Sequence, residues 1–271
     1  MTDSERLALV DRAYAECAPD MLESRLLEIL RECGEECGEA SYAYAAMLSE
    51  MGGFYRGRTD FEKAERYFLR AAEILREVSG ERSADRATVL NNLAGTYRME
   101  GRFAEAEKLL HEVMELYAET VGEKHVLYAS ALNYLALTYL DERDFPRAED
   151  TLARASKILA ELPGCRDEYA SSLCTRGALL LQTARNDEAE KLLTEAVELY
   201  DTSLGHVTAH YHAALNSLGI VYFQRKDYEK ALGYFEKAYA AAEKYYGEYH
   251  AETQGIRDAL ALTRRKLEEK A

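Results

Sequence analysis

Residues 87–110 read ATVLNNLAGTYRMEGRFAEAEKLL, and residues 129–152 read ASALNYLALTYLDERDFPRAEDTL. Each stretch begins with apolar residues at positions i, i+3, i+4 and i+7, which lie on one side of an α-helix. In the first stretch these residues are Leu90, Leu93, Ala94 and Tyr97, and in the second they are Leu132, Leu135, Ala136 and Tyr139. A short polar turn follows, and an aromatic residue then opens a second amphipathic stretch. Both segments therefore predict a pair of helices joined by a tight turn.

The same pattern recurs along the chain with a fixed period. Marker glycines stand at Gly38, Gly80, Gly122, Gly164, Gly205 and Gly247, and marker alanines at Ala64, Ala106, Ala148, Ala189 and Ala231. Successive glycines are 42, 42, 42, 41 and 42 residues apart. Such a period indicates a repeat architecture. The one missing residue falls in the loop after Gly164, where a change of length costs least.

The ends of the helices carry recognisable signals. Asp60, Asp144 and Asp227 precede the second helix of their repeats and are expected to cap it. The marker glycine is expected to end that helix in the left-handed conformation. Near the N-terminus, Asp20 and Glu23 have the spacing of a capping box.

The combined pattern of Leu90, Leu93, Ala94, Tyr97, Gly101, Phe103, Ala106 and Leu110 resembles a tetratricopeptide repeat. The 42-residue period is similar to the variant found in kinesin light chains and many bacterial repeat proteins. This resemblance implies an all-α, right-handed superhelical solenoid of antiparallel helix pairs, with the first helices on the concave side. We expect one domain over residues 1–271, with a degenerate pair over 1–39, five repeats over 40–252 and a capping helix over 253–271.

The fourth repeat departs from its siblings. It has Arg176, Leu180 and Asn186 where the others have leucine, tyrosine and an aromatic residue. Looser packing is expected there. The family also often has tryptophan near the start of the first helix, where this chain has leucine, as at Leu90 and Leu132.

Charge and composition limit the partners. The formal net charge of the 271-residue chain is −15, which disfavours nucleic acid and anionic membrane surfaces. The longest apolar run, residues 42–48, is far shorter than the ~20 residues of a membrane helix. Five cysteines at irregular spacing do not form a disulfide framework and are typical of reduced thiols in the cytosol. We therefore expect a cytoplasmic protein, and the composition fits a bacterial one.

Two sets of positions beside the packing stripe of the first helices are candidate ligand contacts. The first set is Ser49, Asn91, Asn133, Cys174 and Asn216. Asparagine both donates and accepts, so a row of asparagines can hold a peptide main chain whatever its sequence. Alternatively, these amides bond neighbouring helices.

The second set is basic in the N-terminal repeats and apolar in the C-terminal repeats. Seven residues after the first set come Arg56, Arg98, Leu140, Leu181 and Phe223, and four residues after it come Gly53, Gly95, Leu137, Ala178 and Ile220. The arginines with glycines beside them leave room for a carboxylate or phosphate. The apolar residues suit a hydrophobic or amphipathic peptide. The alternative is that these apolar residues pack between helices and that the arginines pair with acids.

Enzymatic signals are weak. The sequence has no Walker loop, dinucleotide fingerprint, nucleophile elbow or zinc-protease motif. His206, His210 and His212, with Asp201 nearby, could meet a metal or could simply belong to a solvated loop. No cofactor is expected.

Taken together, the sequence predicts a non-catalytic scaffold that binds a protein or peptide segment in the groove of the solenoid. The predicted binding residues are Ser49, Arg56, Asn91, Arg98, Asn133, Leu137, Leu140, Leu181, Asn216, Ile220 and Phe223. The alternatives are a regulatory sensor of a small peptide or metabolite, and a metal-dependent enzyme that uses the three histidines. A homodimer is also possible.

Overall fold

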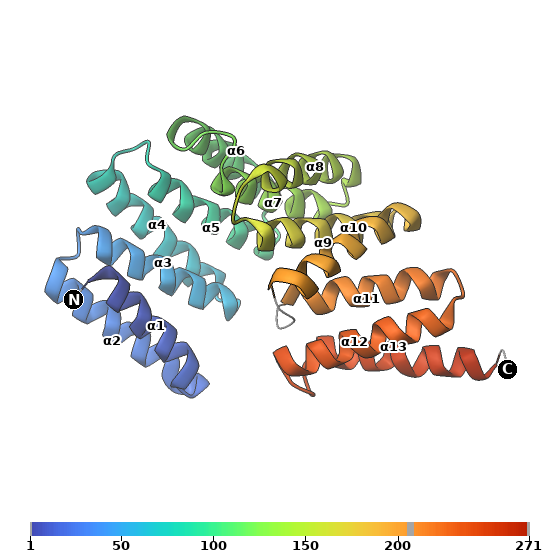
Figure 1. Cartoon of the computed structure of the whole chain (residues 1–271). Coiled ribbons are helices and arrows are strands. Elements are labelled where there is room, and N and C mark those ends of the chain that lie inside the picture. Colours follow the sequence, from blue (N-terminus) through green and yellow to red (C-terminus); the bar gives the residue numbers. More distant parts are fainter. Residues whose placement is uncertain (1, 205–208, 270–271) are drawn as a thin grey trace. The chain divides into compact units, whose positions relative to one another are not determined.

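The computed structural model describes residues 2–204 and 209–269 (Figure 1). Over these residues the chain is entirely helical, with thirteen α-helices and one turn of π-helix and with no strand. The α-helices are α1 (Asp3–Glu16), α2 (Pro19–Cys37), α3 (Tyr42–Gly57), α4 (Phe61–Ser79), α5 (Ala84–Glu100), α6 (Phe103–Thr120), α7 (Val126–Asp141), α8 (Phe145–Glu161), α9 (Arg166–Gln182), α10 (Asn186–Leu199), α11 (Ala209–Gln224), α12 (Tyr228–Tyr246) and α13 (Ala251–Glu268). The π-helical turn, Tyr200–Leu204, follows α10. The predicted all-α array of helix pairs is confirmed.

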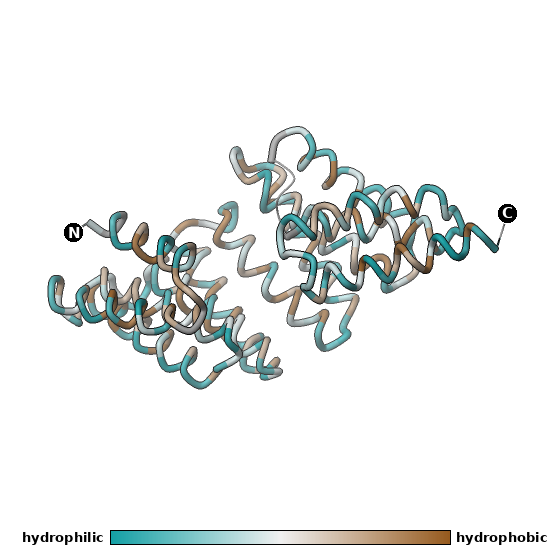
Figure 2. Tube along the Cα trace, turned by 90° about the horizontal axis from the view of Figure 1, so that it is seen from below, coloured by the Kyte–Doolittle hydropathy of each residue, from teal (hydrophilic) through white to brown (hydrophobic). Residues whose placement is uncertain are grey.

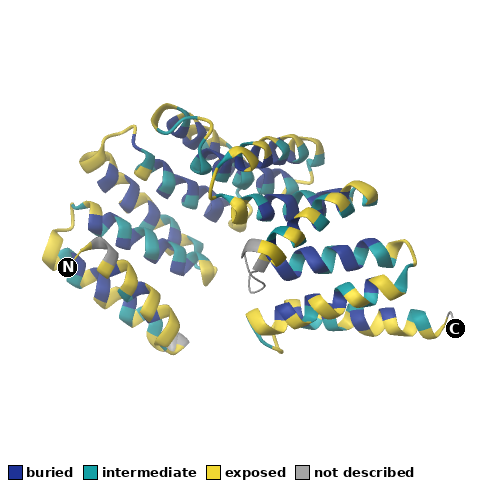
Figure 3. Cartoon of the chain, in the orientation of Figure 1, coloured by how far each residue is buried: buried dark blue, intermediate teal, exposed yellow. Residues whose placement is uncertain are grey.

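The chain divides into two compact units, unit 1 (Met1–Thr138) and unit 2 (Tyr139–Ala271). Within unit 1, α3 packs against α4, α4 against α5, and α5 against α6. Within unit 2 the same order holds for α9 to α12, and α13 packs against α12. Polar and apolar stretches alternate along the helices in Figure 2, and the buried residues in Figure 3 lie on helix faces that meet another helix. No helix in the described ranges is long and apolar enough to cross a membrane.

The two helices of a pair approach closely through a small residue on the first and a large one on the second. A Cβ added at Gly52 would lie 2.8 Å from the ring of Phe68, and one added at Gly219 would lie 2.5 Å from the ring of Phe235. In α5 and α6 the same two positions hold Ala94 and Leu110, both fully buried. In these repeats glycine faces phenylalanine where alanine faces leucine, so the combined volume stays similar, as a densely packed interior requires. The fourth repeat is an exception, because Gly177 there faces Leu193, 2.5 Å from an added Cβ.

Two kinds of turn join the helices. Between the helices of a pair, one residue adopts a positive φ, and this residue is Thr59, Gly101, Arg143, Ala184 or Lys226. Between pairs, the marker glycine does so, as at Gly80 (φ 90°, ψ 159°) and Gly247 (φ 89°, ψ 164°). The expected left-handed cap is therefore wrong for these two glycines, because their ψ is extended. That combination of φ and ψ is essentially restricted to glycine.

The predicted N-caps of the second helices are confirmed. The carboxylates of Asp60, Asp144 and Asp227 each accept a hydrogen bond from a backbone N–H in the first turn. The capping box predicted at Asp20 is wrong, because α2 already begins at Pro19. The N-cap residue is Ala18, which has no side-chain acceptor, so the helix starts without a side-chain cap. Proline is tolerated at the first helical position because the N–H there has no partner within the helix.

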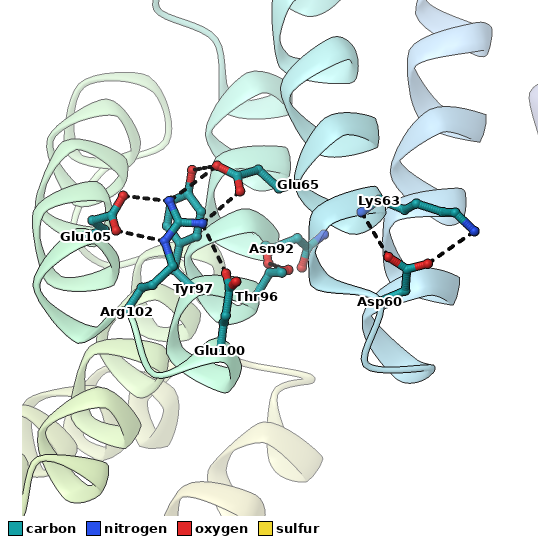
Figure 4. A network of polar contacts seen from close by, with 9 residues as sticks. All are labelled: Asp60, Lys63, Glu65, Asn92, Thr96, Tyr97, Glu100, Arg102 and Glu105. Carbon is teal, nitrogen blue, oxygen red and sulfur yellow. Dashed lines mark hydrogen bonds and ion pairs between the residues drawn. The ribbon is translucent and has the colours of Figure 1, made fainter.

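Tyrosines at the ends of the first helices tie successive pairs together. The hydroxyl of Tyr97 donates to Glu65 of the preceding pair at 2.7 Å, and Arg102 donates to the same carboxylate at 2.7 Å (Figure 4). The equivalent Tyr55 donates to Glu23, also at 2.7 Å. The hydrogen bonds from Arg102 and Tyr97 hold the pKa of Glu65 below its ordinary value, although burial opposes them. The hydroxyl groups of these tyrosines thus make contacts between repeats.

Candidate binding surface

The predicted binding residues all lie on the first helices of their pairs, and we call them the inner row. In unit 1 the inner row consists of Ser49 and Arg56 on α3, Asn91 and Arg98 on α5, and Asn133 and Leu137 on α7. In unit 2 it consists of Leu140 on α7, Leu181 on α9, and Asn216, Ile220 and Phe223 on α11. Asn91 is buried and the other ten are half-buried. Each unit is described separately below.

The asparagines of unit 1 carry unmet hydrogen-bonding capacity. The Oδ1 atoms of Asn91 and Asn133 are both inaccessible to solvent and accept no hydrogen bond. Leaving a buried acceptor unpaired costs about 1–3 kcal/mol. The alternative in which these two oxygens bond neighbouring helices therefore finds no support. Asn91 and Asn133 hold equivalent places on consecutive first helices, 42 residues apart.

Arg56 is the second polar feature of unit 1. Its Nη1 donates to the backbone carbonyl of Asn92 on α5 at 3.2 Å, and its guanidinium lies 5.9 Å from the ring centroid of Phe68. Among the described residues no carboxylate pairs with it. The expected pairing with a nearby acid is thus not found for Arg56. Its charge is held in place by neutral groups, which leaves it available to an anionic ligand.

The space that was expected beside Gly95 for a bound anion is occupied. A Cβ at Gly95 would lie 2.8 Å from the Tyr134 ring and 3.4 Å from Nη1 of Arg56. Gly95 therefore makes room for a tyrosine of the next helix and not for a bound anion. At Gly53 a Cβ would meet nothing within 4 Å, so that position is open as predicted. Tyr134 was missed because its repeat equivalent, Asn92, is small and polar.

In unit 2 the inner row is apolar and partly engaged in packing. Leu181 packs against the core cluster that includes Leu173 and Leu215. Ile220 and Phe223 pack beside Phe235. All three stay half-buried, so each combines a packing role with an accessible face. The packing alternative is thus confirmed for these three side chains, and their contact with a ligand stays a prediction.

The histidines are engaged with different partners. His206 lies outside the described residues. His210 is exposed and lies 3.2 Å from the hydroxyl of Ser171, whereas His212 is buried with its ring centroid 5.2 Å from that of Tyr246. The nearby Asp201 accepts a hydrogen bond from Tyr211 at 2.8 Å. In the parts of the chain that the structure describes, no three His, Cys, Asp or Glu side chains converge on a metal position.

The cysteines are free thiols. Cys33 and Cys174 are buried, and Cys37 is exposed. Burial raises the pKa of Cys174 to about 12, so it stays protonated at neutral pH. A protonated, buried thiol is a poor nucleophile and a poor metal ligand.

Comparison with protein families finds a match to the model described as tetratricopeptide repeat. The model matches four times, over residues 43–119, 85–161, 127–202 and 211–271. These matches together cover most of the chain. No curated protein matches the sequence.

Solved structures share the fold at low sequence identity. One is BtubC (BKLC) from P. vanneervenii, 21% identical, with a TM-score of 0.61 over 94% of this chain and 92% of that one. Another is the Podosopora anserina putative kinesin light chain with nearly identical TPR-like repeats, 19% identical, with a TM-score of 0.60 over 75% and 97%. NprR in complex with its cognate peptide NprX is 13% identical, with a TM-score of 0.65 over 99% and 74%. At these identities the likeness shows the fold alone.

Proposed function

We propose that this chain, which belongs to the tetratricopeptide repeat family, is a non-catalytic scaffold that binds a peptide or protein segment through its inner row. Fold alone does not fix function, so the proposal depends on the residues of the site. NprR, which shares the fold, is described in complex with a peptide. A peptide or protein partner suits an acidic chain better than nucleic acid or an anionic membrane does.

The observation that carries the proposal is the pair of unpaired amide oxygens at Asn91 and Asn133. An extended peptide presents backbone N–H groups that can donate to these oxygens after a small side-chain rotation. Such a contact would offset the cost of leaving the acceptors unpaired, and only when ligand is bound. Because it is made to the main chain, it would add affinity for many sequences.

Selectivity would come from the other inner-row residues. Arg56 has no carboxylate partner among the described residues and can hold a carboxylate of the ligand in a bidentate pair. In unit 2 the accessible faces of Leu181, Ile220 and Phe223 suit apolar side chains. The inner row of unit 1 would thus select acidic ligand residues, and that of unit 2 would select apolar ones.

The cysteines indicate the cellular compartment. All five cysteines are free, which suits a reducing compartment, so we place the protein in the cytoplasm. We assign no cofactor to the proposed activity, because binding through amide, guanidinium and apolar groups requires none.

Charge reversal tests the proposal. Peptides selected from a displayed random library on the full chain supply the ligands, and isothermal titration calorimetry gives their affinities. For ligands with an acidic residue, the double variant Arg56→Glu, Arg98→Glu should bind about tenfold more weakly or worse. The matched control is Lys108→Glu, an exposed residue on the second helix α6. If the double variant and the control lost affinity equally, or if neither lost affinity, the arginines would not be part of the binding surface.

A further inference from the structure

A hollow separate from the inner row opens between the second helices of unit 1. It has a volume of 660 Å³ and lies between α2 and α4, above Leu48 and Tyr55 of α3. Its sides are formed by Leu27, Lys63, Arg66, Tyr67, Leu69 and Arg70. No inner-row residue lines it. We call it the outer groove.

Two exposed leucines give the outer groove its apolar character. Leu27 is 39% exposed and Leu69 is 47% exposed. They occupy the same register position, 42 residues apart. In the later repeats that position holds His111, Ala153, Thr194 and Glu236. The fold therefore does not require leucine there, since four of the six copies do without it.

The aromatic wall behind the leucines shows which part of the groove belongs to the scaffold. The rings of Tyr55 and Tyr67 stack at 5.3 Å with Lys63 over Tyr55. The same stack recurs in unit 2, where its members are Tyr222, Tyr234 and Lys230. In the unit 2 copy the positions of Leu69 and Arg66 hold Glu236 and Gly233. The arginine beside that stack is Arg225, 5.7 Å from the ring centroid of Tyr222, and it comes from the turn before α12. The stack is thus present in both units, whereas Leu69 and Arg66 accompany it only in unit 1.

The lining of the outer groove is cationic as well as apolar. It includes Lys63 of the stack together with Arg66 and Arg70, and no carboxylate lines the groove, although the chain carries a net charge of −15. Arg70 pairs with Glu73 at 3.0 Å in an exposed contact. Lys63 lies 3.2 Å from Asp60 and 3.9 Å from Glu23. Such exposed pairs are weak and exchange readily for another anion.

Arg66 has no ion pair among the described residues. On the other side of Leu69 and Arg70, a second hollow of 450 Å³ adds Arg76 and Arg86, with Glu73 as its one acid. The two hollows share Leu69 and Arg70, so the positive charge extends across α4.

We infer that the outer groove is a docking site for an acidic amphipathic segment of a partner protein, with large apolar side chains on Leu27 and Leu69 and carboxylates on Arg66 and Arg70. An apolar floor with a cationic rim complements a helix that has an apolar stripe between acidic residues. A second copy of this acidic chain suits the site less well, because the copies repel each other. The inference is independent of the proposed function of the inner row.

The test uses a fluorescein-labelled peptide of sequence DELLDFFEELLD and a copy with lysine at every acidic position. Fluorescence anisotropy with the full chain should show saturable binding of the acidic peptide only, weakening as salt is added. Leu69→Glu and Arg66→Glu should each weaken binding by about tenfold or more. Their matched controls, His111→Glu and Lys108→Glu, carry the same change at the same register positions one repeat later and should bind like the wild type. All four positions are exposed, so each variant should fold.

Three outcomes would overturn the inference. The first is no saturable binding of the acidic peptide, and the second is equal binding of the lysine copy. The third is wild-type self-association, in sedimentation velocity, that Leu69→Glu abolishes, because a second copy would then occupy the groove. The inner row would also bind an acidic, apolar peptide, so Leu69→Glu and Arg66→Glu are measured again in the double variant Asn91→Ala, Asn133→Ala, where the remaining binding should still weaken by about tenfold or more. That variant separates failure at the outer groove from failure at the inner row.

Discussion

Unit 1 and unit 2 contain the same Lys-Tyr-Tyr stack but differ in what surrounds it. In unit 1 the stack is Lys63, Tyr55 and Tyr67, and in unit 2 it is Lys230, Tyr222 and Tyr234. The residues of this stack, which join a first helix to a second one, are thus the same in the two units. Residues that face solvent beside them have diverged, from leucine and arginine to glutamate and glycine. Divergence at a non-packing position is where a repeat protein can acquire a specific partner.

One tie between successive helix pairs differs from the tie that occurs in both units. In unit 2, Glu190 accepts from Tyr222 and Arg225. In unit 1, Glu65 accepts from both Tyr97 and Arg102. In the fourth repeat, leucine at position 180 removes the tyrosine, and Glu149 accepts from Arg185. Glu65 is 25% exposed, whereas Glu149 is 39% exposed. The fourth repeat thus lacks one hydrogen bond to the equivalent carboxylate, and its looser packing stays a prediction.

The largest effects are expected where helices approach closely in both units. Gly52→Ala in unit 1 and Gly219→Ala in unit 2 force a methyl group against Phe68 and Phe235, which should cost about 1–3 kcal/mol of unfolding free energy. Urea denaturation measures this cost. The matched control is Gly233→Ala in α12, where a Cβ meets nothing and the helix should gain about 0.5–1 kcal/mol.

A double variant tests whether the glycine and phenylalanine are coupled. Gly52→Ala combined with Phe68→Leu recreates the Ala94 and Leu110 pair of the next repeat. The double variant should be more stable than the sum of the two single changes predicts. Simple additivity would show that the two positions do not compensate each other.

The inter-pair ties should differ in strength by a smaller amount. Glu65→Gln removes the charge that Tyr97 and Arg102 hold and should cost about 1–2 kcal/mol. Glu149→Gln, the same change where a single arginine binds, should cost about 0–1 kcal/mol. Chemical denaturation of the two variants gives the comparison. If Glu149→Gln cost as much as Glu65→Gln, the tyrosine would not strengthen the tie.

The pH dependence of the unfolding free energy is a second test of the tie at Glu65. The pKa of Glu65 is lowered in the folded chain, so its ionised form adds stability above the ordinary pKa of 4.5, and this stability is lost as pH falls through the folded value. The difference in unfolding free energy between wild type and Glu65→Gln should therefore be constant near neutral pH and shrink below about pH 4.5. A difference that does not change down to pH 3 would contradict the assigned ionisation.

The smallest effects are expected at the tight turns. Thr59 in unit 1 and Lys226 in unit 2 both have a positive φ, at 59° and 62°. That conformation is more strained for a β-branched residue than for lysine. Thr59→Gly should raise the unfolding free energy by about 0.5 kcal/mol, and Lys226→Gly by less. Thermal unfolding monitored by circular dichroism can rank the two, and the opposite order would contradict the strain at Thr59.

Much of the fold could be predicted because residues of the same type recur at each packing position in several repeats. The period located the helix pairs, and an aspartate such as Asp60 marks the start of a second helix in three of them. The chain ends were harder, since α2 starts at Pro19 without a side-chain cap. The single superhelical domain remains a prediction.

The candidate site was less predictable, because side-chain contacts between repeats depend on residues that the period does not repeat. Tyr134 fills the space beside Gly95, and no equivalent tyrosine in the other repeats indicates this. Leu27 and Leu69 hold the same position in consecutive repeats, which the sequence shows. The sequence does not show that their side chains are exposed, and it is the exposure that separates them from core leucines.

The most direct test of the inner row pairs two measurements on the double variant Asn91→Ala, Asn133→Ala. Because a buried unpaired acceptor costs free energy, removing the two oxygens should not destabilise the fold, so the unfolding free energy of the variant should lie no more than about 1 kcal/mol below that of wild type. Its affinity for selected peptides should nevertheless fall by about tenfold, whatever their sequence, because the lost contacts are to the main chain. Unchanged affinity, or a loss of affinity that only follows a loss of stability, would contradict a binding role for these asparagines.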